Sequence, residues 1–189
     1  AFHQDKSWLK AKVNYADWTV VETNLPEAAA FILKTLQNVA QLSDLKFKNV
    51  SSYQLKTNLQ FPSNFGLGSI STLMNNLAEW AGINPFKLNE LSLGGSGYDI
   101  AVAREKSAVL YQNFEGTPNS ERVVFKPKFK DELFFIHLNK KQDSREGIQF
   151  YRSKAKSPEL ISILSAITRE VANCEDLERF SELMEVHER

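Results

Sequence analysis

The amino-acid sequence predicts an α+β fold in which antiparallel sheets are covered by helices. From Tyr53 to Phe61, apolar and polar residues alternate with the period of two that is typical of a half-buried strand. From Thr72 to Ala81 and from Pro158 to Val171, apolar residues recur at the spacing of a helix with one apolar face. With 189 residues, 42% of them hydrophobic, the chain has the size of one domain with a core, or of a piece of a larger one.

The N-terminal part predicts a hairpin followed by a helix. The first twenty-odd residues mix aromatic and β-branched side chains with polar ones, and Asn14 to Asp17 supplies residues suited to a turn. Asn24 is typical of a helix cap and Pro26 of a first turn. Helical apolar spacing then continues to about Leu42.

The rest of the chain alternates helices with short strands and glycine-rich breaks. In chain order we expect a helix from Thr72 to Ala81 ended by Gly82, and a short helix begun by Asn84 and Pro85. After the glycines at 94, 95 and 97 we expect a strand-like segment from Tyr98 to Ala103 and a strand through Val109 to Tyr111. We then expect a loop from Glu115 to Glu121 and strands at Val123 to Phe125 and at Leu133 to Leu138, of which the second is buried on both faces. Three helices should follow: one near Ile148 capped by Asp143 or Ser144, one begun by Ser157 and Pro158, and a last one through Leu177 to Met184.

Composition excludes several classes of partner and site. Twenty-three basic residues balance twenty-three acidic ones, so no overall field attracts nucleic acid or an anionic membrane. No apolar stretch has the length of a signal or membrane-spanning segment, and the single cysteine, Cys174, cannot form an internal disulfide, which favours a cytoplasmic protein. His3, His137 and His187 lack the spacing of metal ligands.

The segment from Pro62 to Thr72 joins the predicted strand to a helix through two glycines. Such a loop directs unpaired backbone N–H groups and the positive end of the helix toward one point, which can bind phosphate. The hydroxyls of Ser69, Ser71 and Thr72 can add hydrogen bonds or reach a magnesium ion. A glycine turn with a capped helix is the alternative interpretation, and the loop is not a Walker loop because no lysine follows its glycines.

A second segment, from Gly94 to Ala101, carries one acidic residue, Asp99, among glycines and uncharged side chains. If Asp99 faces the same cleft as the loop, its carboxylate can accept the proton of an attacking hydroxyl during phosphoryl transfer. The alternative is an aspartate that bonds only to the N–H groups of its own turn.

Together the two segments resemble the GHMP kinase superfamily, named for galactokinase, homoserine kinase, mevalonate kinase and phosphomevalonate kinase. The family's phosphate loop, Pro-x-x-x-Gly-Leu-Gly-Ser-Ser, is matched by Pro62, Gly66, Leu67, Gly68 and Ser69. Its substrate-side motif, Ser-Gly-x-Asp-x-Ala, is matched by Ser96, Gly97, Asp99 and Ala101. The string from Gly97 to Ala101 is similar to the signature that names the GYDIA group of these kinases.

The resemblance implies a role for each matched segment. Asp99 would be the catalytic aspartate, and the backbone from Gly66 to Ser71 would hold the phosphates of ATP. Ile70 replaces the family's second serine, often credited with contacting magnesium, so Ser69 or Ser71 would take over as the metal ligand. The substrate side would include Ser96, Gly97 and a basic loop with Lys140, Lys141, Ser144 and Arg145, which could hold an anionic substrate group; a solvated basic turn is its alternative.

The resemblance also implies a fold and an activity. We expect the central part of a GHMP kinase, in which Tyr53 to Ala103 contains both the nucleotide loop and the aspartate segment and residues 123–189 begin the C-terminal domain. We also expect that the family's two ends are missing and that ATP binding is consequently weak. The expected reaction transfers the γ-phosphoryl group of MgATP to a small acidic metabolite, mevalonate or phosphomevalonate being the leading candidates. A decarboxylase that consumes ATP and a catalytically silent binding or assembly protein remain alternatives, and homodimer formation stays open.

Overall fold

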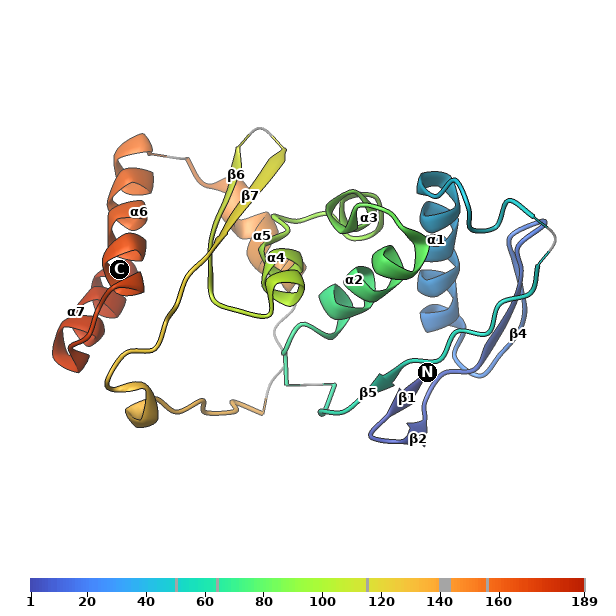
Figure 1. The fold of residues 1–189 in the computed structure, drawn as a ribbon, viewed down its shortest axis with the longest axis horizontal. Helices are drawn as coiled ribbons and strands as arrows, with labels where there is room; N and C mark the ends of the chain where they lie inside the picture. The colour runs from blue at the N-terminus through green and yellow to red at the C-terminus, as the bar shows by residue number, and fades with distance from the viewer. Residues whose placement is uncertain (50, 64, 115, 140–143, 156, 189) are drawn as a thin grey trace. The chain divides into compact units, whose positions relative to one another are not determined.

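The structure, a computed structural model, describes residues 1–189 except 50, 64, 115, 140–143, 156 and 189 (Figure 1). The side chains of 144–146 and 148 are also outside the described part. The described residues form two compact units, 1–104 and 105–189. Helices alternate with small sheets along the chain, which confirms the α+β class.

The first unit begins with short strands and continues with helices. Its elements are β1 (Phe2–His3), β2 (Lys6–Ser7), β3 (Ala11–Asn14), β4 (Thr19–Thr23), α1 (Pro26–Leu42), β5 (Asn58–Leu59), α2 (Ser69–Ala81), α3 (Pro85–Ser92) and α4 (Tyr98–Glu105).

The predicted N-terminal hairpin is confirmed by the antiparallel pair β3 and β4. In its turn, Asn14 Oδ1 accepts from the Ala16 N–H at 3.1 Å and Asp17 Oδ1 accepts from the Thr19 N–H at 3.2 Å. These bonds replace ladder partners with side-chain acceptors, which is why asparagine and aspartate suit this turn.

The strand predicted from Tyr53 to Phe61 is much shorter in the structure, where β5 covers only Asn58–Leu59. It pairs in parallel with β1, and β1 pairs antiparallel with β2, so this sheet is not purely antiparallel as expected. A strand extends only as far as a neighbour supplies backbone partners, and β1 is two residues long. Alternation in the sequence identified an extended segment but could not reveal how much of it is paired.

The predicted helix to Leu42 is confirmed by α1, which has Pro26 in its first turn. The predicted cap is wrong, because Leu25 occupies the cap position and provides no side-chain bond. Asn24 instead connects the chain to the N-terminal segment: its side chain donates to the Trp8 carbonyl at 2.8 Å and accepts from the Lys10 N–H at 2.7 Å.

The core of the first unit lies among the helices (Figure 1). Four helices contribute its buried side chains, which are Leu36 and Val39 from α1, Met74, Leu77, Ala78 and Ala81 from α2, Leu88 from α3, and Ile100 from α4. Beside this core, aromatic rings contact one another edge to face, with Phe47 meeting Tyr15, Trp18, Tyr53 and Trp80 at centroid distances between 5.0 and 5.9 Å. These contacts show that the aromatic rings pack against one another.

The second unit contains a hairpin and three helices. Its elements are β6 (Val109–Phe114), β7 (Thr117–Arg122), the short 3-10 helix Lys130–Glu132, α5 (Ser144–Ser153), α6 (Pro158–Ala172) and α7 (Leu177–Glu188). The predicted strand at Val109 and the two last helices are confirmed. Ser157 caps α6 as predicted, with its side chain accepting from the Leu160 N–H at 3.2 Å.

Three predictions for the second unit are wrong. The expected loop from Glu115 to Glu121 contains most of β7, and Val123 to Phe125 follows that strand without belonging to it. The segment from Leu133 to Leu138 is not a buried strand: none of its residues belongs to a strand, and Phe134 and Ile136 are 83% and 81% exposed. A continuous apolar run becomes a buried strand only when other elements cover both of its faces.

Candidate functional site

The predicted phosphate loop lies in the first unit, directly before α2. Gly66 and Gly68 have φ angles of 72° and 70°, in the left-handed region that other residues avoid. A Cβ atom added at either glycine would meet no atom within 4 Å, so the loop presents its backbone to open space. A ligand can therefore approach the main chain at both positions.

The N-terminus of α2 has the electrostatics of an anion site. Gly68 occupies the cap position and has no side chain to accept hydrogen bonds from the first-turn N–H groups. The first turn also contains no acidic residue, so the positive end of the helix is not neutralised locally. These are the conditions under which a helix N-terminus binds phosphate.

The hydroxyl groups predicted to assist the loop differ in their bonding. Thr72 donates its hydroxyl proton to the Gly68 carbonyl at 3.1 Å, which occupies the group as a donor and secures the turn. The hydroxyls of Ser69 and Ser71 bond to no other described residue, and both side chains are half-buried. Of the three predicted hydroxyls, those of Ser69 and Ser71 therefore have no hydrogen-bond partner among the described residues.

Asp99 lies in the first turn of α4, so the strand predicted from Tyr98 to Ala103 is a helix instead. Gly97, with a φ angle of 86°, precedes the helix, and its carbonyl accepts from the Ala101 N–H at 3.1 Å. Ile100 and Ala101 are buried, whereas Asp99 is exposed. One face of α4 thus packs on the core while the carboxylate remains at the surface.

A buried asparagine fixes the glycine segment that leads to α4. Asn89 of α3 is 7% exposed, its side chain donates to the Gly94 carbonyl at 3.0 Å, and its backbone carbonyl accepts from the N–H groups of Leu93 and Gly94. Burying an amide is favourable only when its hydrogen bonds are satisfied, which Gly94 achieves here. The turn before Gly97 is consequently held from one side by α3.

The loop helix and the Asp99 helix meet at a second asparagine, Asn75 of α2. Its side-chain Nδ2 donates to the Ser71 carbonyl and to the Ile100 carbonyl, each at 3.1 Å. Because both oxygens lie that far from one nitrogen atom, they are at most twice that distance apart. The first turn of α2 and the residue next to Asp99 are therefore close neighbours.

The surroundings of Asp99 shift its protonation toward the neutral acid. Loss of hydration against the protein raises the pKa of this carboxyl, and interaction with the Tyr98 side chain partly opposes that shift. The negative charge of Asp99 in turn raises the pKa of Tyr98, helped by lost hydration and by the same interaction. A carboxylate with a raised pKa is a better proton acceptor than an ordinary surface aspartate.

The remaining predicted residues fall into two groups. Ile70 is 43% exposed and follows Ser69 in the first turn of α2, so it is not a core residue beneath the loop. Ser96 is exposed beside Gly97 in the approach to α4. Lys140 and Lys141 lie outside the described residues, as do the side chains of Ser144 and Arg145 at the start of α5.

Asn75 and Asn89 are functional candidates that sequence reasoning missed. Both are polar residues within helices whose other inward positions are apolar, Asn75 between Met74 and Leu77 and Asn89 next to Leu88. A polar residue at such a position predicts a buried partner, although the sequence alone does not identify that partner.

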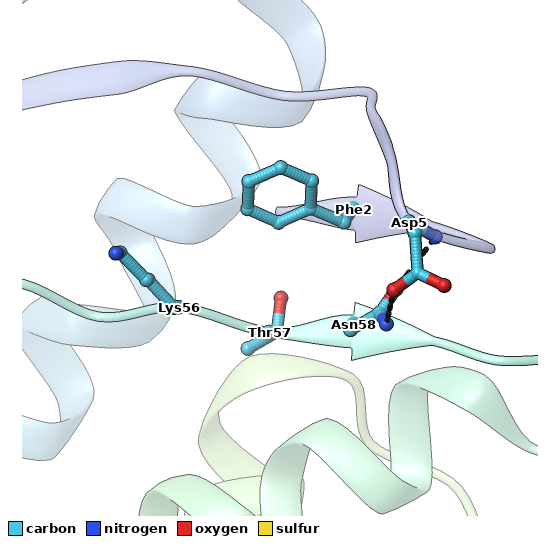
Figure 2. A pocket seen from close by; sticks show the side chains of 5 residues that line it. All are labelled: Phe2, Asp5, Lys56, Thr57 and Asn58. Atoms are coloured by element: carbon cyan, nitrogen blue, oxygen red, sulfur yellow. Dashed lines mark hydrogen bonds between the residues drawn. The ribbon is translucent and has the colours of Figure 1, made fainter.

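An open pocket of about 310 Å³ lies elsewhere in the first unit, lined by Phe2, Asp5, Lys56, Thr57 and Asn58. Figure 2 shows the Thr57 hydroxyl beneath the Phe2 ring and Asp5 joined to Asn58. The Asn58 side chain donates to the Asp5 carboxylate at 2.6 Å, and its Oδ1 atom accepts from the backbone N–H of Asp5 at 3.3 Å. Two of the polar side chains in the pocket thus satisfy each other, and none of its described lining residues belongs to the loop or to α4.

Among the described residues, no group of three or more histidine, cysteine, aspartate or glutamate side chains is arranged to hold a metal ion. No described helix combines the length and the apolar character needed to cross a membrane.

Comparison of the chain with protein-family models, with curated proteins and with solved structures gives no match.

Proposed function

We propose that this protein is a GHMP-type small-molecule kinase, which transfers the γ-phosphoryl group of ATP to a hydroxyl or phosphate of a small acidic metabolite. Mevalonate and phosphomevalonate are the leading acceptors because the motif from Gly97 to Ala101 resembles the GYDIA group. The α+β class of the structure is compatible with this family.

The contact made by Asn75 carries the proposal. Each motif alone has a plain structural explanation, but one amide group contacts both the first turn after the glycine loop and the residue next to Asp99. Phosphoryl transfer requires a phosphate site and a proton acceptor close together, since catalysis depends mainly on positioning and charge stabilisation. The neighbourhood of Ser71 and Ile100 supports that requirement.

Each part of the site has a distinct task in this proposal. The backbone N–H groups after Gly68 bind the phosphates at the positive end of α2. Asp99 orients the acceptor hydroxyl and takes its proton, a role favoured by its exposure and its raised pKa. The neighbouring Tyr98 side chain opposes the raised pKa of the carboxyl and so favours its ionised form.

The donor set of the loop is compatible with a bound magnesium ion. Mg²⁺ in kinase sites is bound largely by phosphate oxygens and water, with one or two protein ligands. The hydroxyls of Ser69 and Ser71, on either side of Ile70, have no partner among the described residues, and these two residues would hold the ion. When bound, magnesium neutralises charge on the phosphates.

The proposal is tested with labelled ATP and a panel of acceptors, using the product of the complete gene. Transfer of label to a mevalonate-like or phosphomevalonate-like acceptor, lost in Asp99→Asn, is the expected result. Release of carbon dioxide from a diphosphorylated acid would assign the protein to the decarboxylases of the superfamily instead. Absence of nucleotide binding would overturn the proposal.

A catalytically silent binding protein is the second candidate, and Ile70 is the observation that favours it. The family's usual hydroxyl is replaced at this position by an apolar side chain that is nearly half exposed. Nucleotide binding without transfer to any acceptor would support this candidate.

A further inference from the structure

We propose that Asn75 is a positioning residue, which holds Asp99 in register with the phosphate loop through its bond to the Ile100 carbonyl. This inference rests on the proposed kinase function and adds to it a residue outside both sequence motifs. Asn75 touches neither the presumed nucleotide nor Asp99 and acts through the backbone of α4.

The side chain of Asn75 makes two hydrogen bonds, one within its own helix and one to α4. Within α2, its Nδ2 atom donates to the Ser71 carbonyl one turn earlier, which fixes the direction of the side chain. The same atom donates to the Ile100 carbonyl, 25 residues away in the sequence. An amide NH₂ group has two hydrogens, so it can make both bonds at once.

Packing surrounds this contact with fixed elements. Met74 is fully buried beside Asn75 in α2, and Ile100 is 1% exposed in the same hydrophobic core. Asp99 immediately precedes Ile100, so a shift of the Ile100 backbone moves the carboxylate with it. The Asn75 bond therefore adds a direct polar contact between the start of α2 and the start of α4.

The two hydrogen bonds of Asn75 contribute modestly to folding, so the apolar core can tolerate their loss. A misplacement on the order of 1 Å, by contrast, can reduce a phosphoryl-transfer rate by roughly 100-fold. Loss of Asn75 should accordingly affect turnover far more than folding.

The test uses Asn75→Leu, which keeps a side chain of similar size and removes both N–H donors without adding charge. Asn75→Ala is a second variant in case the leucine side chain disturbs the helix contact. Asn76→Leu is the matched control, because Asn76 is the adjacent asparagine on α2 and its side chain is exposed.

Two measurements are made on the product of the complete gene. The first is steady-state kinetics with ATP and the best acceptor, where Asn75→Leu should lower kcat by about 10- to 100-fold and leave KM for ATP within about twofold. The second is the pKa of the Asp99 carboxyl, followed by carbon NMR. In Asn75→Leu this pKa should move down toward its ordinary value, because α4 is freed and the carboxylate regains hydration.

The outcomes separate this inference from the proposed function. An active protein in which Asn75→Leu matches Asn76→Leu in kcat would overturn the positioning role and leave the kinase proposal intact. A wild-type protein that transfers no phosphoryl group would overturn the kinase proposal. In that case the positioning role is judged from the pKa of Asp99 alone. If neither Asn75→Leu nor Asn75→Ala changes this pKa, Asn75 does not position the carboxylate.

Discussion

Tyr98 and Asp99 are adjacent and exposed in the first turn of α4, and each shifts the pKa of the other. Lost hydration raises the pKa of the Asp99 carboxyl, whereas interaction with the Tyr98 hydroxyl, which is a hydrogen-bond donor, lowers it. The protonation of the proposed catalytic group thus depends on a second side chain, which can be changed separately by mutation.

Tyr98→Phe removes this donor, so the pKa of Asp99 should rise further above its ordinary value. A base acts only when deprotonated, and the acid limb of the rate profile should therefore move to higher pH. The pH dependence of kcat checks the shift. Tyr111→Phe is the control, since the Tyr111 side chain bonds to Asn113 in the second unit. An acid limb at the same pH in both variants would show that Tyr98 does not tune the carboxylate.

Asp99→Asn keeps the shape of the side chain and removes its ability to take a proton. Phosphoryl transfer should fall by roughly 100-fold or more, with the fold retained, because Asp99 is exposed and lies outside the core. Single-turnover kinetics and circular dichroism measure the two properties. Near-normal turnover in this variant would remove Asp99 from the mechanism.

The same variant changes the pH dependence of stability in a defined direction. The pKa of Asp99 is raised above 3.8 in the folded state, so the folded protein binds more protons than the unfolded chain between the two values. The free energy of unfolding contributed by Asp99 therefore falls as pH rises through that window. Asp99→Asn should be relatively more stable above the window than below it, and a difference that stays constant across pH would contradict the raised pKa.

Gly68→Ala tests the phosphate loop against a control at the other end of the same helix. Gly68 and Gly82 flank α2 with φ angles of 70° and 67°, so alanine at either position costs roughly 1–2 kcal/mol of backbone strain. Only Gly68→Ala places a methyl group in front of the loop, so it alone should weaken nucleotide binding. Thermal unfolding and calorimetry with ATP separate these effects, and equal binding by both variants would exclude the loop as the phosphate site.

Ile70→Ser restores the hydroxyl that the resemblance leads us to expect. Because Ile70 is 43% exposed, the free energy of unfolding should change by less than about 1 kcal/mol. The magnesium concentration for half-maximal activity should fall, because a third hydroxyl joins Ser69 and Ser71. Val102→Ser, at the same exposed fraction in α4, controls for the loss of a β-branched side chain. An unchanged magnesium titration would show that Ile70 does not occupy a ligand position.

Local signals in the sequence were sufficient for most helices of the first unit and for the last two of the chain. The apolar stripe of α2, the asparagine cap at Asn84 and the serine cap at Ser157 depend on residues within one or two turns. For the same reason, the two glycines of the loop and the open N-terminus of α2 could be predicted before any tertiary contact was known.

Predictions failed where the outcome depended on distant partners. The extent of β5 is limited by the two residues of β1, and the apolar run from Leu133 to Leu138 has no described strand beside it. Asn24 was predicted as a cap because its type suits one, yet its side chain bonds to Trp8 and Lys10. In each case the residue pattern was compatible with two environments.

The sequence by itself determined which residue types are present in the candidate site: a glycine loop before a helix and a lone carboxylate among glycines. Only the tertiary structure decided that Asp99 begins a helix, because burial of Ile100 and Ala101 in the core overrides the strand-like composition around them. It also decided that the two segments meet at Asn75. A side-chain amide finds its acceptor by position in space, and a bond spanning 25 residues is invisible to any local pattern.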